Sequence, residues 1–105
     1  MSARILQSIK ERLGQVLPLG GRALLFGSQA RGDAREDSDW DILILIDKDK
    51  VTNDDFDNFA YPLMELGWQI NAVINPLLYT YNDWQKRNFT PFYKNVERDG
   101  IEIWH

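Results

Sequence analysis

Apolar residues recur along the chain with two spacings, and the changes between them predict an alternation of helices and strands. A stripe at helical spacing follows Ser2, a good N-cap, and stops before Pro18. Its members are Ile5, Ile9, Leu13 and Val16. A short apolar run then predicts a first strand over residues 22–26, and the polar segment 33–38 is typical of a loop. Between them we expect a short helix that begins near Ser28.

The middle of the chain continues the same alternation. Branched aliphatic residues predict a second strand that ends around Asp47. Thr52 and Asp55 resemble a capping box, and the apolar stripe after them predicts a helix that stops at Gly67. The next apolar run, residues 68–75, predicts the third strand.

Aromatic residues are spaced among polar ones after Pro76, and two short helices fit this segment best. The second is expected to run from Thr90, an N-cap followed by proline, to Gly100. Residues 101–104 are expected to add an edge strand. We expect most of these aromatic side chains in the core, and any left exposed would mark a partner interface.

Length and element order together indicate the fold class. At 105 residues, without repeats or linker-like segments, the chain is expected to form one domain, residues 1–105. The predicted order of elements belongs to the α+β class, with α/β-type alternation. We expect a small mixed sheet of about three or four strands, packed by helices.

Composition and charge narrow the classes of protein that fit. A net charge of −4 argues against the electrostatic attraction that direct nucleic-acid binding requires. No apolar run approaches the roughly 18 residues needed to span a membrane, so no membrane association is expected. The sequence has no cysteine for a disulfide framework or a thiolate metal site. Charged residues near the start do not suit a signal peptide, and we expect a cytoplasmic protein.

Small residues follow the first predicted strand and suggest a place for a phosphate group. Gly27 allows a tight turn that brings backbone N–H groups close to a ligand. Ser28 adds a hydroxyl donor in the expected first turn of a helix, where unpaired backbone donors favour an anion.

Two aspartates at the start of the second predicted strand suggest a metal site. Asp39 and Asp41 are two positions apart, so a strand places both carboxylates on one face, roughly 7 Å apart along the chain. Two such carboxylates repel each other unless a cation lies between them. Mg²⁺ suits this arrangement, because it binds a few carboxylates together with water and substrate phosphates.

Other phosphate and nucleophile motifs fit less well. Gly27 and Gly32 have the glycine spacing of a P-loop, but Asp33 stands where its lysine must follow. Ser28 has no activating base, because the single histidine is the terminal residue His105. A P-loop protein and a Ser-His-Asp hydrolase are therefore disfavoured.

The segment GSQARGDAREDSDWD resembles the GS-x10-D-x-D motif of the minimal nucleotidyltransferases, small relatives of kanamycin nucleotidyltransferase in the DNA polymerase beta superfamily. The residues that match the family's GSxARG…SDxD pattern are Gly27, Ser28, Ala30, Arg31, Gly32, Ser38, Asp39 and Asp41. The resemblance implies a nucleotidyltransferase fold and a substrate, ATP or another NTP, whose phosphates are held at Gly27 and Ser28. It also implies one or two Mg²⁺ ions bound by Asp39 and Asp41.

Relatives in this family normally carry a third carboxylate on the next strand. In the predicted third strand the best equivalent is Asn71, so the implied catalytic set is Asp39, Asp41 and Asn71. An amide oxygen can bind Mg²⁺ but cannot act as a general base. Glu65 and Asp83 are substitutes, although the first falls in a predicted helix and the second beyond the strand.

Arg31 has two interpretations of equal weight. Its guanidinium suits phosphate binding, which would place it in the nucleotide site. It also suits an ion pair with Asp33 or Glu36 on the surface.

The resemblance leaves three functions open. Minimal nucleotidyltransferases are often encoded beside a helical HEPN partner and act as antitoxins, in some cases by adenylylating a tyrosine of that toxin. We therefore expect transfer of a nucleoside monophosphate, AMP by preference, to a hydroxyl group of a HEPN-like partner protein. The alternatives are a catalytically weak or inactive antitoxin that acts by contact, and an antibiotic-type enzyme whose acceptor pocket arises in a homodimer.

Overall fold

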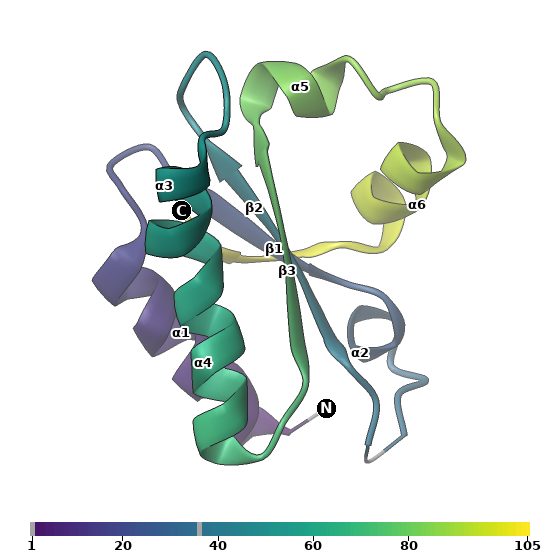
Figure 1. The fold of residues 1–105 in the computed structure, drawn as a ribbon. Helices are drawn as coiled ribbons and strands as arrows, with labels where there is room; N and C mark the ends of the chain where they lie inside the picture. The colour runs from purple at the N-terminus through teal and green to yellow at the C-terminus, as the bar shows by residue number, and fades with distance from the viewer. Residues whose placement is uncertain (1, 36) are drawn as a thin grey trace.

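A computed structural model describes residues 2–35 and 37–105, and it contains a four-stranded sheet with helices on both faces (Figure 1). The elements in chain order are α1 (Ala3–Val16), β1 (Arg22–Phe26), α2 (Ser28–Arg31), β2 (Trp40–Ile46), α3 (Asn53–Asp55), the π-helical turn η1 (Phe56–Ala60), α4 (Tyr61–Ile70), β3 (Ile74–Thr80), α5 (Tyr81–Gln85), α6 (Pro91–Asp99) and β4 (Ile101–Trp104). No helix of the described residues is long and apolar enough to cross a membrane.

The sheet has the strand order β3-β2-β1-β4 and is mixed. β1 is antiparallel to both β2 and β4, whereas β2 and β3 are parallel. The parallel pair requires a crossover, which α3, η1 and α4 provide. The expected α+β class and the expected mixed sheet are confirmed.

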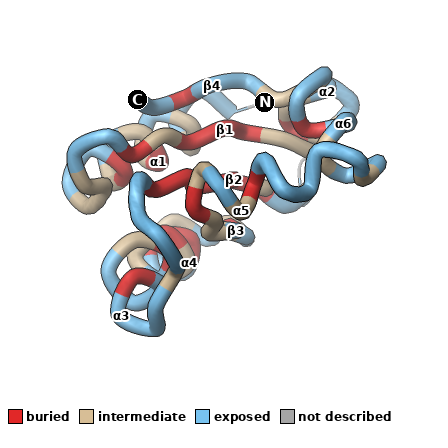
Figure 2. Tube along the Cα trace, turned by 90° about the horizontal axis from the view of Figure 1, so that it is seen from above, coloured by how far each residue is buried: buried red, intermediate tan, exposed pale blue. Residues whose placement is uncertain are grey.

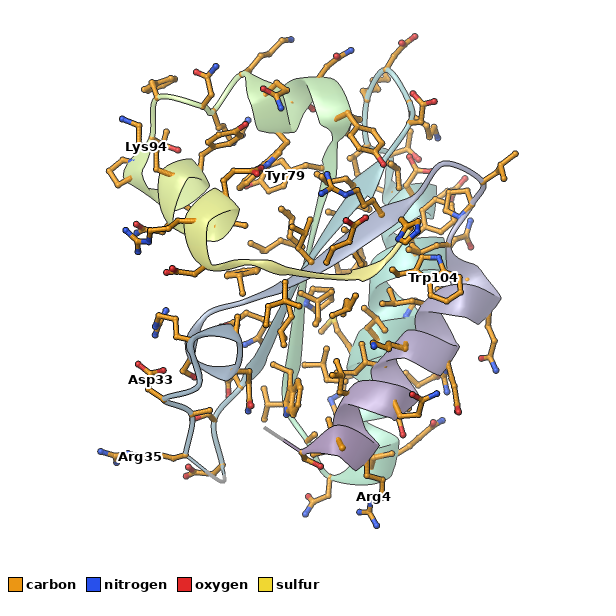
Figure 3. All side chains as sticks on the ribbon, turned by 180° about the vertical axis from the view of Figure 1, so that it is seen from behind. Arg4, Asp33, Arg35, Tyr79, Lys94 and Trp104 are labelled. Carbon is orange, nitrogen blue, oxygen red and sulfur yellow. The ribbon has the colours of Figure 1, made fainter. Side chains whose placement is uncertain are left out.

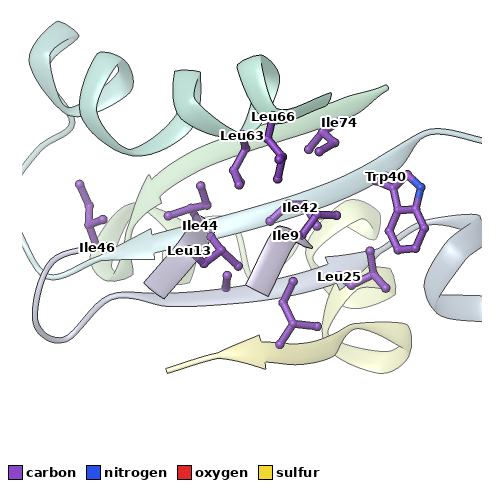
Figure 4. Close-up of a cluster of buried hydrophobic side chains, with 12 residues drawn as sticks. Ile9, Leu13, Leu25, Trp40, Ile42, Ile44, Ile46, Leu63, Leu66 and Ile74 are labelled. Carbon is purple, nitrogen blue, oxygen red and sulfur yellow. The ribbon is translucent and has the colours of Figure 1, made fainter. Parts of the chain in front are cut away.

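One face of the sheet carries the larger apolar cluster, beneath α1 and α4 (Figure 4). Its buried residues are Ile9, Leu13, Ala23, Leu25, Trp40, Ile42, Ile44, Ile46, Leu63, Leu66, Ile74 and Ile103. A smaller cluster lies beneath α5 and α6 on the other face, and consists of Leu24, Leu43, Leu45, Trp84 and Val96. Alternate residues of β1 and β2 face the two clusters, as the period of a strand requires.

Several local predictions are confirmed. Ser2 caps α1 by accepting a hydrogen bond from the backbone N–H of Ile5. The capping box of Thr52 and Asp55 is present, with both reciprocal hydrogen bonds. Thr90 caps α6 and accepts from the N–H of Tyr93, three residues after it.

The predicted third strand, residues 68–75, is wrong in position. α4 continues through Gly67 to Ile70, and the strand that follows is Ile74–Thr80. Gly67 serves packing and does not end the helix, because an added Cβ would collide with the carbonyl oxygen of Ala72. Pro76 lies inside β3, which tolerates it because β3 is an edge strand.

The aromatic residues after Pro76 divide between core and surface. Trp84 is buried and packs against Tyr79 and Tyr93, with ring centroids 5.6 and 4.8 Å away. Phe89 and Phe92 remain exposed. The expectation of a core role therefore holds for part of this segment only.

Candidate active site

Asp39, Asp41 and Asn75 meet at one end of the sheet. The side-chain nitrogen Nδ2 of Asn75 donates to Oδ2 of Asp39 at 2.9 Å and to Oδ1 of Asp41 at 3.3 Å. β2 and β3 are paired in parallel so that Asp41 stands beside Asn75. The first residue of β2, Trp40, donates its backbone N–H to the carbonyl of Val73 at 2.8 Å, which ties the starts of the two strands together.

Electrostatics make this corner receptive to a cation. Two carboxylates share a single amide group as a hydrogen-bond donor, and a neutral amide compensates only part of their charge. Asp39 and Asn75 are exposed and Asp41 is half-buried, so a ligand can reach all three side chains.

Gly27 brings the turn after β1 against the same carboxylates. Its backbone has φ 75° and ψ −159°, a conformation essentially restricted to glycine. A Cβ at this position would collide with Oδ2 of Asp41. β1 and β2 are paired so that Phe26, the residue before the turn, stands beside Asp41. The turn and the aspartate pair of the GS-x10-D-x-D segment are thus contiguous.

Ser28 is the first residue of α2, a single short turn. The backbone N–H groups of Ala30 and Arg31 both donate to the carbonyl of Gly27 at 3.1 Å. The N–H groups of Ser28 and Gln29, at the start of α2, have no backbone acceptor within the helix. α2 ends at Arg31 and is capped by Gly32, whose φ is 80°. The turn therefore places Gly27 beside Asp41 and leaves the first backbone N–H groups of α2 without an intrahelical acceptor.

Gln29 supports the site and was missed by the sequence reasoning. It is 4% exposed, and its Nε2 donates to the backbone carbonyl of Ser38 at 3.2 Å, immediately before Asp39. The hydroxyl of Ser38 accepts from the N–H of Arg35 at 2.7 Å. These bonds hold the loop that delivers Asp39, and the only prior signal for Gln29 was its place inside the motif.

Arg31 forms an ion pair with Asp33, with Nε 3.4 Å from Oδ2, and both side chains are exposed. Figure 3 shows Asp33 and the nearby Arg35 pointing away from the body of the molecule. The alternative partner Glu36 lies outside the described residues. A phosphate contact of Arg31 stays a prediction.

Asn71 is not brought to the aspartates, and its assignment as the third site residue is corrected to Asn75. Asn71 caps the end of α4 with φ 58°, and across residues 2–35 and 37–105 it makes no hydrogen bond with Asp39 or Asp41. The signal for Asn75 was the run Ile-Asn-Pro-Leu, which matches the family pattern apolar-Asp-apolar-apolar once Pro76 is allowed in a strand.

The two other acidic substitutes are also remote from this corner. Glu65 lies on α4, 3.9 Å from Nη1 of Arg12. Asp83 lies on α5, which follows the opposite end of β3.

The donor set fits a magnesium ion held mainly by the substrate. Carboxylate oxygens are the ligands that Mg²⁺ prefers, and one or two of them are sufficient when phosphates and water supply the rest. Within the described part of the chain, no group of three or more histidine, cysteine, aspartate or glutamate residues could hold a metal ion. Asp39 and Asp41 would be the acidic ligands of such an ion.

Comparison with known proteins shows which family the chain belongs to. A family model described as "Nucleotidyltransferase domain" matches residues 3–102. The chain belongs to the nucleotidyltransferase domain family. Two proteins of Methanocaldococcus jannaschii, each named "Putative protein adenylyltransferase", are similar to this nucleotidyltransferase domain. One is 34% identical over 82 residues, which cover 78% of this chain and 77% of the relative. The other is 35% identical over 79 residues, covering 75% and 73%.

Two solved structures share the nucleotidyltransferase fold. One is a crystal structure of a toxin–antitoxin with AMP-PNP, with a TM-score of 0.64 and 20% identity, covering 94% of this chain and 72% of that one. The other is a toxin–antitoxin MntA-HpeT mutant, with a TM-score of 0.61 and 18% identity, covering 94% and 71%. At these identities the likeness establishes the fold.

Proposed function

We propose that this nucleotidyltransferase domain transfers AMP from Mg·ATP to a hydroxyl group of a partner protein. The observation that carries the proposal is the convergence of Asp39 and Asp41 beside the turn at Gly27. A phosphate-binding turn that touches a pair of carboxylates is the arrangement that phosphoryl-group chemistry needs, because positioning and charge neutralisation dominate such reactions.

Each residue has a distinct part in the proposed reaction. The backbone at Gly27 and the hydroxyl of Ser28 hold the phosphates, while Asp39 and Asp41 hold the metal. When bound, Mg²⁺ would neutralise charge on the phosphate oxygens and help to orient them. The acceptor oxygen forms a bond to the α-phosphorus, the bond from that phosphorus to the bridging oxygen breaks, and pyrophosphate leaves.

The fate of the acceptor proton depends on Asn75. An amide cannot take up a proton, and Asp39 and Asp41 are assigned to the metal in this proposal, so the proton passes to solvent water. We therefore expect slow transfer, with the rate rising when Asn75 is replaced by aspartate.

Two findings support a protein as the acceptor. The relatives named above as putative adenylyltransferases are described as acting on proteins, and the fold neighbours are described as toxin–antitoxin structures. Asp39 and Asn75 are exposed, which leaves room for a hydroxyl group on a large partner. A HEPN-like toxin is the partner we propose, with a second copy of the chain as the alternative.

A second candidate function is nucleotide binding without transfer, in an antitoxin that neutralises its partner by contact. The neutral Asn75 at the third position favours it, since the site keeps its metal ligands but has no third carboxylate.

Labelled ATP separates the two functions. The purified chain is incubated with α-labelled ATP, Mg²⁺ and a candidate HEPN partner, and transfer is followed by the label on the partner and by a mass increase of one AMP unit. Enzyme function predicts label that disappears in Asp41→Ala, persists in the exposed control Asp57→Ala, and increases in Asn75→Asp. A stable complex without label, unchanged by Asp41→Ala, would support the contact antitoxin instead.

A further inference from the structure

A pocket adjoins the proposed site, between α6 and the turn at Gly27. Its volume is about 230 Å³, and its walls include Gly27 and Arg31 on one side and Phe92, Asn95 and Asp99 of α6 on the other. Gly27 borders both this pocket and Asp41. The pocket is therefore continuous with the place proposed for the phosphates.

The volume of the pocket is large enough for only part of a nucleotide. Pockets for drug-sized ligands are roughly 300–1,000 Å³, so about 230 Å³ is too small for a whole nucleoside triphosphate. It suits a single flat ring system, with the sugar and phosphates leaving past Gly27.

One wall offers a fixed aromatic surface. Phe92 is 37% exposed and meets Phe26 and Trp84 edge to face, with ring centroids 5.6 and 5.8 Å away. Trp84 is itself buried and donates from Nε1 to Oε1 of Glu97 at 2.8 Å, so its ring is held in place. A base can stack on an aromatic ring that is held in this way.

The polar groups of the pocket suit a base with an amino group. Asn95 and Asp99 are four residues apart on α6 and therefore share one face of the helix. Arg98 donates to both oxygens of Asp99 at 2.9 Å and holds the pKa of that carboxyl below its usual range, so Asp99 is an ionised acceptor at neutral pH. An asparagine amide pairs with the N6 and N7 atoms of adenine, and a carboxylate accepts from an amino group.

We propose that α6 forms the base subsite of this domain and selects adenine, with Phe92 as the stacking wall and Asn95 and Asp99 as hydrogen-bond partners. The proposal rests on the proposed function for the position of the phosphates. It assigns a role to α6, which carries none of the motif residues.

Calorimetry with two probes tests the subsite. AMP-PNP and tripolyphosphate are each titrated into the chain with Mn²⁺, the second probe having the phosphates without a base. In Asn95→Ala, AMP-PNP should bind roughly 10-fold more weakly, a loss typical of a removed base contact, while tripolyphosphate binds unchanged. Phe92→Leu should behave alike, and the control Asn82→Ala, an exposed asparagine of α5, should match the unmodified protein. Equal affinities of AMP-PNP for Asn95→Ala and the unmodified chain would overturn the subsite.

Adenosine and inosine decide the proposal independently of metal and phosphates. We expect adenosine to shift the side-chain amide resonances of Asn95 in a ¹⁵N–¹H spectrum, and inosine, which lacks the amino group, to shift them far less. Equal or absent shifts would contradict adenine selection. If tripolyphosphate fails to bind while adenosine still shifts Asn95, the phosphate site and the proposed function fail but the base subsite stands.

Discussion

The two faces of the sheet differ in how far their apolar cover extends. Beneath α1 and α4, one buried cluster follows the strands from Trp40 to Ile46. Beneath α5 and α6, the buried cluster includes Leu43 and Leu45 of β2, and two residues before Leu43 the same face carries Asp41. Figure 2 shows the helices on opposite sides of the sheet, with α1 and α4 on one side and α5 and α6 on the other.

This difference links one face of the sheet mainly to folding stability and the other to the proposed chemistry. The face beneath α1 and α4 carries the larger buried cluster, so we expect it to contribute more hydrophobic free energy of folding than the other face. The other face stops being apolar where α5 and α6 no longer cover it, and the charged corner lies there. Substitutions on the first face should therefore change unfolding more than binding, and substitutions at the corner should do the reverse.

The largest loss of stability is expected for Leu63→Ala, on the covered face. Leu63 is fully buried in the larger cluster, and truncating such a side chain leaves a cavity that costs about 2–5 kcal/mol. Urea unfolding followed by circular dichroism measures the loss. The folded variant should bind Mn·AMP-PNP as the unmodified protein does, and weakened binding would show that the two faces are not independent.

Gly27→Ala should have the next largest effect and act on both properties. The glycine-only backbone conformation predicts a loss of about 1–3 kcal/mol, and the collision with Asp41 should abolish nucleotide binding. Gly32→Ala is the matched control, because Gly32 also has positive φ but has no atom within 4 Å of its added Cβ. Equal nucleotide binding by Gly27→Ala and Gly32→Ala would show that the close contact between Gly27 and Asp41 is not needed for nucleotide binding.

The capping box beside α3 tests stability at a distance from the site. Removing the Thr52 hydroxyl by Thr52→Ala should cost about 1 kcal/mol in urea unfolding, since it accepts from the N–H of Asp55. An unchanged urea midpoint would show that the hydrogen bond from Asp55 to the Thr52 hydroxyl does not stabilise the fold.

Asp55 adds a dependence on pH. The hydrogen bonds from Lys48, and then that from the N–H of Thr52, hold the pKa of Asp55 below its ordinary value. The folded pKa is thus lower than the unfolded one, so this stabilisation is present above about pH 4 and is lost as the pH falls through the folded pKa. Asp55→Asn should be less stable at pH 7 and should lose less on acidification. If the free energies of unfolding of Asp55→Asn and the unmodified protein changed equally with pH, Asp55 would not be the source of the pH dependence.

The smallest change of stability is expected for Asp41→Asn, which should stay within about 0.5 kcal/mol because Asp41 has no cationic partner within ion-pair distance in the described chain. Its Mn²⁺ binding, followed by water proton relaxation, should fall below detection. Retained Mn²⁺ affinity would show that the metal is not held by the two aspartates.

The local sequence determined the part of the molecule from α1 to β2. Residues 22–26 were predicted as a strand and form β1, because apolar runs, capping residues and glycines act over a few positions. The same local signals indicate the turn at Gly27 and the aspartate pair.

Only the tertiary structure decided β3 and the third side chain of the corner. Gly67 ordinarily indicates the end of a helix, but here it lies inside α4, where the carbonyl oxygen of Ala72 leaves no room for a Cβ. Pro76 ordinarily interrupts a strand, but β3 accepts it because β3 is at the edge of the sheet. Because α4 continues past Gly67 and β3 includes Pro76, the third strand lies further along the chain than the local pattern predicts. Asn75, and not Asn71, therefore stands beside Asp41. Pairing between distant strands sets which residue faces the aspartates, and a local pattern contains no information about that register.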